Sequence, residues 1–257
     1  MAVAHDRFPL LTLDMLLSRK HNFIFIKTIK VAGTSVEYAL SKLCKEPEDV
    51  VTPLGAQADI MRLAEGCVPR NYSDRETERD YLNALEAGDV LKAGDVRSRA
   101  ISCMRFHNHI SAQDVRTELG AKTWNAAFKF SIVRNPYDFA ISALCHHMAN
   151  LSLAITPWAR RRHLLTIVRN MANINFELTS IDGRLALDPL LSYESIVEGL
   201  QKIAPRIGGD VSANLPRFKS QYRPPPNMGA ATEFTYLEKQ LIALAWRKEF
   251  QAFGYRR

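Results

Sequence analysis

The stretch NFIFIKTIKVAGTSVEYAL, residues 22–40, changes character halfway along. It begins with the unbroken apolar run FIFI, which is followed by two lysines. The small residues Ala-Gly-Thr-Ser come next, before an amphipathic segment. A continuous apolar run is typical of a strand buried on both faces of a parallel sheet. The stretch therefore predicts a strand over 22–28, a small-residue turn, and a helix over 34–45.

The same order recurs further along the chain. FKFSIV, residues 128–133, predicts a second buried strand, which RNPYD breaks and a helix through FAISALCHHMA follows. Cap and stop signals predict four further helices, one opened by Ser111 and Asp114, one by Thr156-Pro157, one over 194–204, and one opened by Thr235 and Glu238. This alternation predicts an α/β fold with a mainly parallel central sheet flanked by helices.

The chain of 257 residues is expected to form a single domain over residues 1–257. Residues 46–100 are polar and charge-rich, with helical patches and no strong strand, and we interpret them as a variable insertion or lid over the sheet. The apolar N-terminal patch is interrupted by Asp14 and matches neither a signal peptide nor a membrane span, so a cytoplasmic protein without an integral membrane segment is expected.

The overall charge favours an anionic partner. With 34 Lys and Arg against 27 Asp and Glu, the chain carries a net charge of +7, which suits nucleotides, phosphates, acidic sugars or membrane surfaces without choosing among them. The four cysteines are far apart and contain no C-x-x-C pair, which argues against a zinc ribbon or a redox dithiol.

The turn from Lys30 to Ser35 lies between a predicted strand and a predicted helix. A helix N-terminus offers unpaired backbone N–H groups and a partial positive charge of about half a unit. Gly33 permits close approach of an oxyanion, Thr34 and Ser35 add hydroxyl groups, and Lys30 adds a full charge. The alternative interpretation is an ordinary turn with an exposed lysine and a Ser or Thr cap.

A second polar turn follows the strand at 128–133. It places Arg134, the natural bidentate partner of a phosphate, at the strand end, and Ser142 lies eight residues on in the next helix. The alternative is an arginine paired with Asp138 and a helix-surface serine. Ligands of open α/β sheets bind at the carboxyl ends of the strands, so two such turns suit a nucleotide with phosphates at both ends of its ribose.

Together these motifs resemble the sulfotransferases that use 3′-phosphoadenosine 5′-phosphosulfate (PAPS), in particular their carbohydrate and bacterial branch. KVAGTS is similar to the family's 5′-phosphosulfate motif, and FSIVRNPYDFAIS to its 3′-phosphate motif. The resemblance extends to HISAQDVRTELGAKTWNAAFKF, LLSYESIVEGLQKI, LPRFKSQYRP and WRKEFQAFGY, and is slight over 46–100. Ile29 and Val31 stand where the family usually has Pro and Thr, and Phe139 stands where it often has Arg.

The resemblance implies a P-loop-like core that binds PAPS and releases 3′,5′-ADP, and it assigns site residues. The expected nucleotide contacts are Lys30, Ala32, Gly33, Thr34, Ser35, Arg134 and Ser142. Lys30 is expected to stabilise charge on the leaving phosphate, since sulfuryl transfer is an in-line displacement that depends on positioning and charge stabilisation. Histidine suits deprotonation of the acceptor hydroxyl, so His109 is the first choice for the general base and His107 the second.

Other basic residues are assigned less directly. Arg217 and Lys219 could close over the 3′-phosphate or the acceptor, or belong to a solvated basic loop. The histidines show no metal-ligand spacing, so no metal site is expected. Nothing resembles a nucleic-acid fold with base-stacking aromatics, and ARRRH at 159–163 is interpreted as an exposed helix face or an anionic acceptor contact.

The sequence thus predicts a PAPS-dependent sulfotransferase acting on a hydroxyl of a sugar, a glycan or a small natural product. One rival is a P-loop-like nucleotide kinase or phosphotransferase, disfavoured because the Walker pattern and an acidic Mg²⁺-binding pair are absent from the sequence. The other is a non-catalytic nucleotide-binding protein, which would bind the nucleotide without turnover.

Overall fold

A computed structural model of the chain describes residues 15–100, 104–106, 110–154, 156–213, 215–216, 218 and 234–257. Within these ranges five strands form one sheet in the order β3-β1-β2-β4-β7, and two short strands form a separate hairpin. The strands are β1 Met15–Ser18, β2 Phe23–Ile26, β3 Val50–Val51, β4 Phe128–Val133, β5 Ser180–Ile181, β6 Arg184–Leu185 and β7 Leu190–Ser192.

The helices follow in chain order. They are α1 Gly33–Ser41, α2 Ala56–Ala64, α3 Arg75–Glu86, α4 Val90–Ala100, α5 Ala112–Leu119, α6 Ala121–Ala126, α7 Pro136–Asn150, α8 Pro157–Met171, α9 Ile174–Thr179, α10 Ile196–Ile207, α11 Tyr236–Ala245 and α12 Arg247–Ala252, with a 3-10 turn at Tyr193–Ser195.

The α/β class predicted from the sequence is confirmed, with a mixed rather than uniformly parallel sheet. β2 pairs parallel to β4, and β4 parallel to β7, whereas β1 is antiparallel to both β2 and β3. The sequence prediction included no strand at β1. The tight connection from Ser18 to Phe23 explains the antiparallel pairing, because a short turn cannot carry the chain back for a parallel strand.

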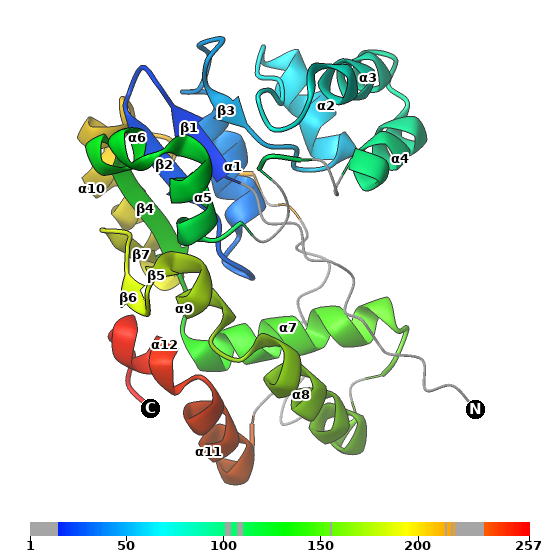
Figure 1. Cartoon of the computed structure of the whole chain (residues 1–257). Helices are drawn as coiled ribbons and strands as arrows, with labels where there is room; N and C mark the ends of the chain where they lie inside the picture. Colours follow the sequence, from blue (N-terminus) through cyan, green and yellow to red (C-terminus); the bar gives the residue numbers. More distant parts are fainter. Residues whose placement is uncertain are drawn as a thin grey trace.

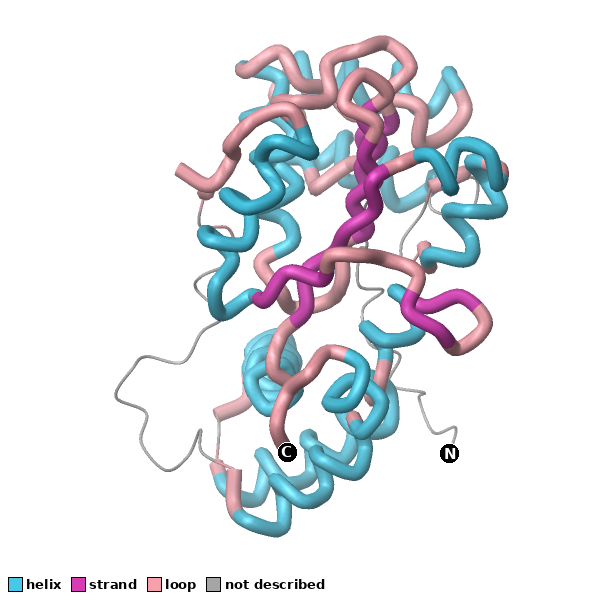
Figure 2. The backbone as a smooth tube through the Cα atoms, turned by 90° about the vertical axis from the view of Figure 1, so that its left-hand side faces the viewer, coloured by secondary structure: helices cyan, strands magenta, loops and turns pink. Residues whose placement is uncertain are grey.

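Helices cover both faces of the sheet, and successive side chains of β2 point to opposite faces. Phe23 and Phe25 pack against α1 and α10, while Ile24 and Ile26 pack with residues of α3 to α6. Figure 2 shows the strands nearly edge on, with helices on both sides. The continuous apolar run FIFI is thus explained by a layer on each face.

A third group of apolar residues lies beyond the carboxyl ends of β2 and β4. It is formed by α7, α8, α9, α11 and α12 together with Ile29 from the turn after β2. In Figure 1 these helices lie below the sheet, at the end where the two predicted anion-binding turns emerge. The position of Ile29 in this cluster means that the first turn is in contact with C-terminal helices.

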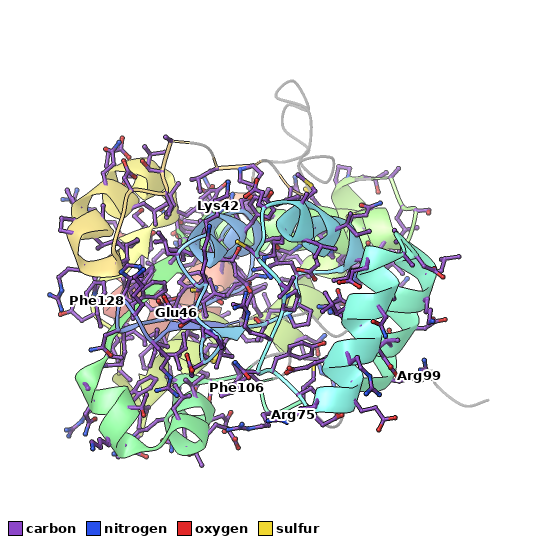
Figure 3. All side chains as sticks on the ribbon, turned by 90° about the horizontal axis from the view of Figure 1, so that it is seen from above. Lys42, Glu46, Arg75, Arg99, Phe106 and Phe128 are labelled. Carbon is purple, nitrogen blue, oxygen red and sulfur yellow. The ribbon has the colours of Figure 1, made fainter. Side chains whose placement is uncertain are left out.

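Residues 46–100, interpreted from sequence as an insertion or lid, contribute to the sheet and to its core. Val50–Val51 pairs with β1 as an edge strand, and side chains of α3 and α4 join the apolar cluster on the Ile24 face. Seen from above in Figure 3, Arg99 of α4 and Phe128 of β4 lie on opposite sides of the molecule. The sequence pattern missed β3 because two residues are too few to show a strand periodicity.

The predicted helix boundaries agree closely with the structure where capping residues mark them. Ser111 and Asp114 form a capping box on α5, Thr156 caps α8, and Thr235 with Glu238 caps the helix that opens at Tyr236. That last helix was expected to continue to Gly254, but the helix is interrupted at Trp246 and resumes as α12.

Candidate functional site

The turn after β2 has an unusual backbone. Lys30 and Ala32 both adopt left-handed conformations, with φ 61° and φ 56°, which cost a non-glycine residue about 1 kcal/mol or more each. Ala32 is the N-cap of α1 and, among the described residues, no side chain caps this helix. The interpretation of the turn as one with a Ser or Thr N-cap is therefore wrong.

The free end of α1 is where an anion would find donors. The N–H groups of Ser35 and Val36 already donate to the carbonyl oxygen of Ala32, at 2.9 and 3.3 Å. Gly33 and Thr34 begin the helix, where an N–H has no acceptor within the helix itself. Their N–H groups and the dipole of α1 are the backbone contribution that the turn can make to anion binding.

Gly33 is required by packing inside the protein. A Cβ at this position would lie 2.4 Å from Cγ of Lys27, whose stem crosses the start of α1 to reach Glu37. The Nζ of Lys27 lies 3.1 Å from Oε2 of Glu37, and both side chains are buried. The glycine thus lets a buried ion pair form directly behind the turn.

A buried polar network continues from Glu37 into the segment 46–100. Oε1 of Glu37 accepts hydrogen bonds from Thr52 and Arg62, at 3.0 and 3.4 Å. Arg62 also donates to Asp59 at 3.1 Å. Burial raises the pKa of the Asp59 carboxyl, while the Arg62 guanidinium opposes that shift. The network joins α1 to α2, so the orientation of α1 depends on residues that sequence analysis assigned to a variable insertion.

Three successive residues of the turn are bound to neighbouring elements. The hydroxyl of Thr28 donates to the carbonyl oxygen of Ile132 on β4. Ile29 exchanges two backbone hydrogen bonds with the side chain of Asn175, at 2.8 and 3.2 Å. Nη1 of Arg134 donates to the carbonyl oxygen of Lys30 at 3.0 Å. These bonds offset the strain of the left-handed residues and bring the two predicted motifs into direct contact.

The turn after β4 is built differently. The Arg134 guanidinium lies over the ring of Tyr193, 4.4 Å from its centroid. The Asn135 side chain accepts from the N–H of Tyr137 and caps α7. Asp138, the alternative partner considered for Arg134, is exposed.

A carboxylate closes this second turn. Oε1 of Glu194 accepts from the N–H of Asn135 at 2.8 Å, and Oε2 accepts from Tyr255 at 2.7 Å. Burial raises the pKa of Glu194, but hydrogen bonds from Ser192, Asn135 and Tyr255 outweigh it and hold the pKa below its usual range. Glu194 is therefore ionised at neutral pH and occupies a backbone donor of the turn.

The charge of Lys30 acts on a thiol of α7. Burial raises the pKa of the Cys145 thiol on α7, and the positive charge of Lys30 opposes this shift. Ser142 lies one turn before Cys145 on the same helix face and is half-buried. The structure thus places Lys30, Arg134 and α7 around one region at the carboxyl edge of the sheet.

One described residue of the predicted basic loop reaches this region. The N–H of Phe218 lies 3.5 Å from Oγ of Ser35, and its ring packs edge-on against Tyr38 of α1 with 5.5 Å between the centroids. Arg217 and Lys219 lie outside the described residues. His107 and His109, the candidates for the general base, also lie outside them.

The described ranges contain no group of three or more His, Cys, Asp or Glu side chains arranged to hold a metal ion. His147 of α7 and His163 of α8 form a pair, with 3.1 Å between Nε2 and Nδ1. No helix in the described part of the chain is both long and apolar enough to span a membrane.

Several residues of this region carry no local sequence signal. Asn175, Glu194 and Tyr255 contact the turns from positions far along the chain, and no cap, repeat or charge pattern distinguishes them in the sequence. Only the resemblance of LLSYESIVEGLQKI to a family segment drew attention to the neighbourhood of Glu194.

Comparison with known proteins gives no family for this chain. No protein-family model, no curated protein and no solved structure matches it.

Proposed function

We propose that this protein is a PAPS-dependent sulfotransferase that transfers a sulfuryl group to a hydroxyl of a sugar, a glycan or a small natural product. One observation carries the proposal above the others: Arg134 donates to the carbonyl oxygen of Lys30 at 3.0 Å. The two turns whose sequences resemble the 5′- and 3′-phosphate motifs of that family follow adjacent parallel strands and touch each other.

The residues present fit such a nucleotide in their donor chemistry. Gly33 and Thr34 supply N–H groups at a helix end that no described side chain caps, and Lys30 adds a positive charge. Arg134 offers a guanidinium placed over the Tyr193 ring, and a guanidinium suits bidentate contact with a phosphate. This pairing of a P-loop-like backbone site with a separate arginine favours a nucleotide with two phosphate groups.

PAPS would supply the activated sulfuryl group, and the chain's own residues would orient it and stabilise charge. Lys30 would neutralise the negative charge that develops on the leaving phosphate, assisted by the N–H groups of residues 33–35. His109, or failing that His107, would take the proton from the acceptor hydroxyl. Ser142 and the basic pair Arg217 and Lys219 would add contacts to the nucleotide or the acceptor.

The proposal is tested by binding and turnover with the full chain. Titration calorimetry with 3′,5′-ADP, and separately with ATP and Mg²⁺, should give binding of 3′,5′-ADP only. Incubation with PAPS and a panel of glycans and phenolic or alcoholic small molecules should release 3′,5′-ADP in an acceptor-dependent manner. Binding of ATP with Mg²⁺ but not of 3′,5′-ADP would favour the kinase, and nucleotide binding without turnover on any acceptor would favour the non-catalytic protein.

A further inference from the structure

The backbone of Ile29 is held by a side chain from the C-terminal half of the chain. Oδ1 of Asn175 accepts from the Ile29 N–H at 2.8 Å, and Nδ2 donates to the Ile29 carbonyl oxygen at 3.2 Å. Asn175 is buried, with 1% of its surface exposed. Its amide therefore satisfies the donor and the acceptor of one residue, much as a neighbouring strand would.

This contact depends on the type of residue at position 29. Proline at this position would have no N–H to donate to Asn175. Proline also fixes its own φ, whereas Ile29 has no such internal restraint. The next residue, Lys30, is left-handed at φ 61°. In this chain an external partner, Asn175, supplies the restraint at the position before the strained lysine.

Asn175 is itself fixed by a buried carboxyl group. Oε1 of Glu249 on α12 accepts from the N–H groups of Asn175 and Phe176, at 2.9 and 3.4 Å. These groups belong to the first turn of α9, so Glu249 caps that helix from a position far along the chain. The side chain of Glu249 is fully buried, which leaves Asn175 little freedom to turn away from Ile29.

From this geometry we infer that Asn175, anchored by Glu249, is a positioning residue that sets the backbone of the turn from Ile29 to Ala32. The inference concerns the same turn as the proposed function and rests on that function only for its consequence in nucleotide binding. C-terminal helices thereby control the conformation of an anion-binding loop near the start of the chain.

The chain offers a matched control for Asn175. Two residues earlier, Asn173 bonds to the same C-terminal region, donating to the carbonyl oxygen of Ala245 at 2.7 Å and accepting from the N–H of Lys248 at 3.1 Å. Asn173 is left-handed, with φ 56°, so Asn173→Gly removes both side-chain bonds without adding strain. Neither bond involves Asn175 or Glu249, so the variant should leave Ile29 paired.

The test measures the rate of amide hydrogen exchange at the Ile29 N–H in the full chain without ligand. This rate is divided by the exchange rate of the Phe25 N–H of β2 to give a ratio. Asn175→Ala should raise that ratio about tenfold or more because the Ile29 N–H loses its acceptor, and Asn173→Gly should leave it unchanged. An unchanged ratio in Asn175→Ala, or an equal rise in Asn173→Gly, would overturn the inference.

Two variants at Glu249 provide a second route should Asn175→Ala not fold. Glu249→Gln keeps an oxygen that accepts from Asn175 and should preserve the Ile29 ratio, whereas Glu249→Met has similar size without an acceptor and should raise it. Equal ratios in these two variants would contradict the anchoring role of Glu249.

A binding measurement separates this inference from the proposed function. If the wild-type chain binds 3′,5′-ADP, Asn175→Ala should weaken that binding about tenfold and Asn173→Gly should not. If the wild-type chain does not bind 3′,5′-ADP, the proposed function fails while the exchange ratios still decide whether Asn175 positions the turn.

Discussion

The turns after β2 and β4 have the same order of strand, polar residues and helix, yet they are built in opposite ways. The first has two left-handed residues and begins a helix that no described side chain caps. In the second, the helix start is capped by Asn135, and the Asn135 N–H donates to Glu194. In the first turn the backbone is restrained from outside by Asn175 and Arg134, whereas in the second turn the local sequence supplies the cap.

This difference assigns different kinds of anion contact to the two turns. The first can offer backbone N–H groups as well as the Lys30 charge, because the start of α1 is not used by a capping side chain. The second has already used its helix start and offers mainly the guanidinium of Arg134. A strained backbone that persists only through outside contacts is typical of a functional site.

If the proposed function holds, the largest expected effect is that of Lys30→Ala, which should lower the rate of sulfuryl transfer about a hundredfold or more because charge on the leaving phosphate would lose its partner. The melting temperature should change little, since Lys30 is half-exposed. Acceptor-dependent release of 3′,5′-ADP measures the rate, and Lys42→Ala, at the other end of α1, is the control. A rate in Lys30→Ala equal to that of the control would remove the first turn from the reaction.

Arg134→Ala should abolish the proposed preference for 3′,5′-ADP over 5′-AMP, with affinity for 3′,5′-ADP reduced about tenfold to a hundredfold by loss of the proposed charge-assisted phosphate contact. Calorimetric titration of both nucleotides gives the ratio.

Arg206→Ala is the matched control for Arg134→Ala, because Arg206 also lies over an aromatic ring, that of Phe128, 4.5 Å from its centroid. Phe128 is at the amino end of β4, away from the proposed site. A preserved preference for 3′,5′-ADP in Arg134→Ala would mean that the second turn does not hold the 3′-phosphate.

Gly33→Ala should destabilise the protein by about 1–3 kcal/mol, because the new Cβ would meet the stem of Lys27 and disturb its buried pair with Glu37. Urea unfolding measures this loss. Gly94 on α4 has open space at its Cβ position, so Gly94→Ala should stabilise by about 0.5–1 kcal/mol. Equal effects at the two glycines would show that packing behind the first turn does not require Gly33.

Glu249 should make stability fall as pH rises through neutrality. Burial raises the pKa of this carboxyl from 4.5 to about 8, against hydrogen bonds from Asn175 and Phe176. The folded chain therefore holds a proton that the unfolded chain has released, and the free energy of unfolding should fall by about 1.4 kcal/mol per pH unit until about pH 8. Urea unfolding near pH 6 and near pH 7.5 should show this slope in the wild type and a shallower one in Glu249→Gln.

The smallest effects should have opposite signs at the two helix starts. Asn135→Ala removes the cap of α7 and should destabilise by about 1 kcal/mol, without changing nucleotide affinity. Ala32→Gly relieves a left-handed residue and should stabilise by about 0.5 to 1 kcal/mol. Thermal unfolding resolves both changes, and destabilisation by Ala32→Gly would mean that the first turn is not under backbone strain.

Much of the fold could be predicted from local patterns. The runs FIFI and FKFSIV gave β2 and β4, and the caps at Ser111, Thr156 and Thr235 gave the starts of three helices. These features depend on residues within one turn or one strand, so their physics is contained in a short stretch. The α/β class followed from their alternation.

The site was predicted only in part. Lys30 to Ser35, Arg134 and Ser142 were predicted as anion contacts from residue types, spacing and the family resemblance, and these roles stay predictions. The structure brings the two turns together at one sheet edge. Asn175, Glu194 and Tyr255 were missed because each acts through tertiary contacts. Gly33 was assigned to oxyanion approach, and only the structure showed that the stem of Lys27 also requires it.

Local sequence was enough to identify the buried strands β2 and β4 and the helices that follow them, because apolar periodicity and capping act over a few residues. Tertiary structure alone decided the antiparallel insertion of β1, the incorporation of residues 46–100 into the core, and the restraint of Ile29 by Asn175. Those outcomes depend on hydrogen bonds and packing between residues up to 146 positions apart. A contact at such a distance depends on how the whole chain folds, and no local pattern records it.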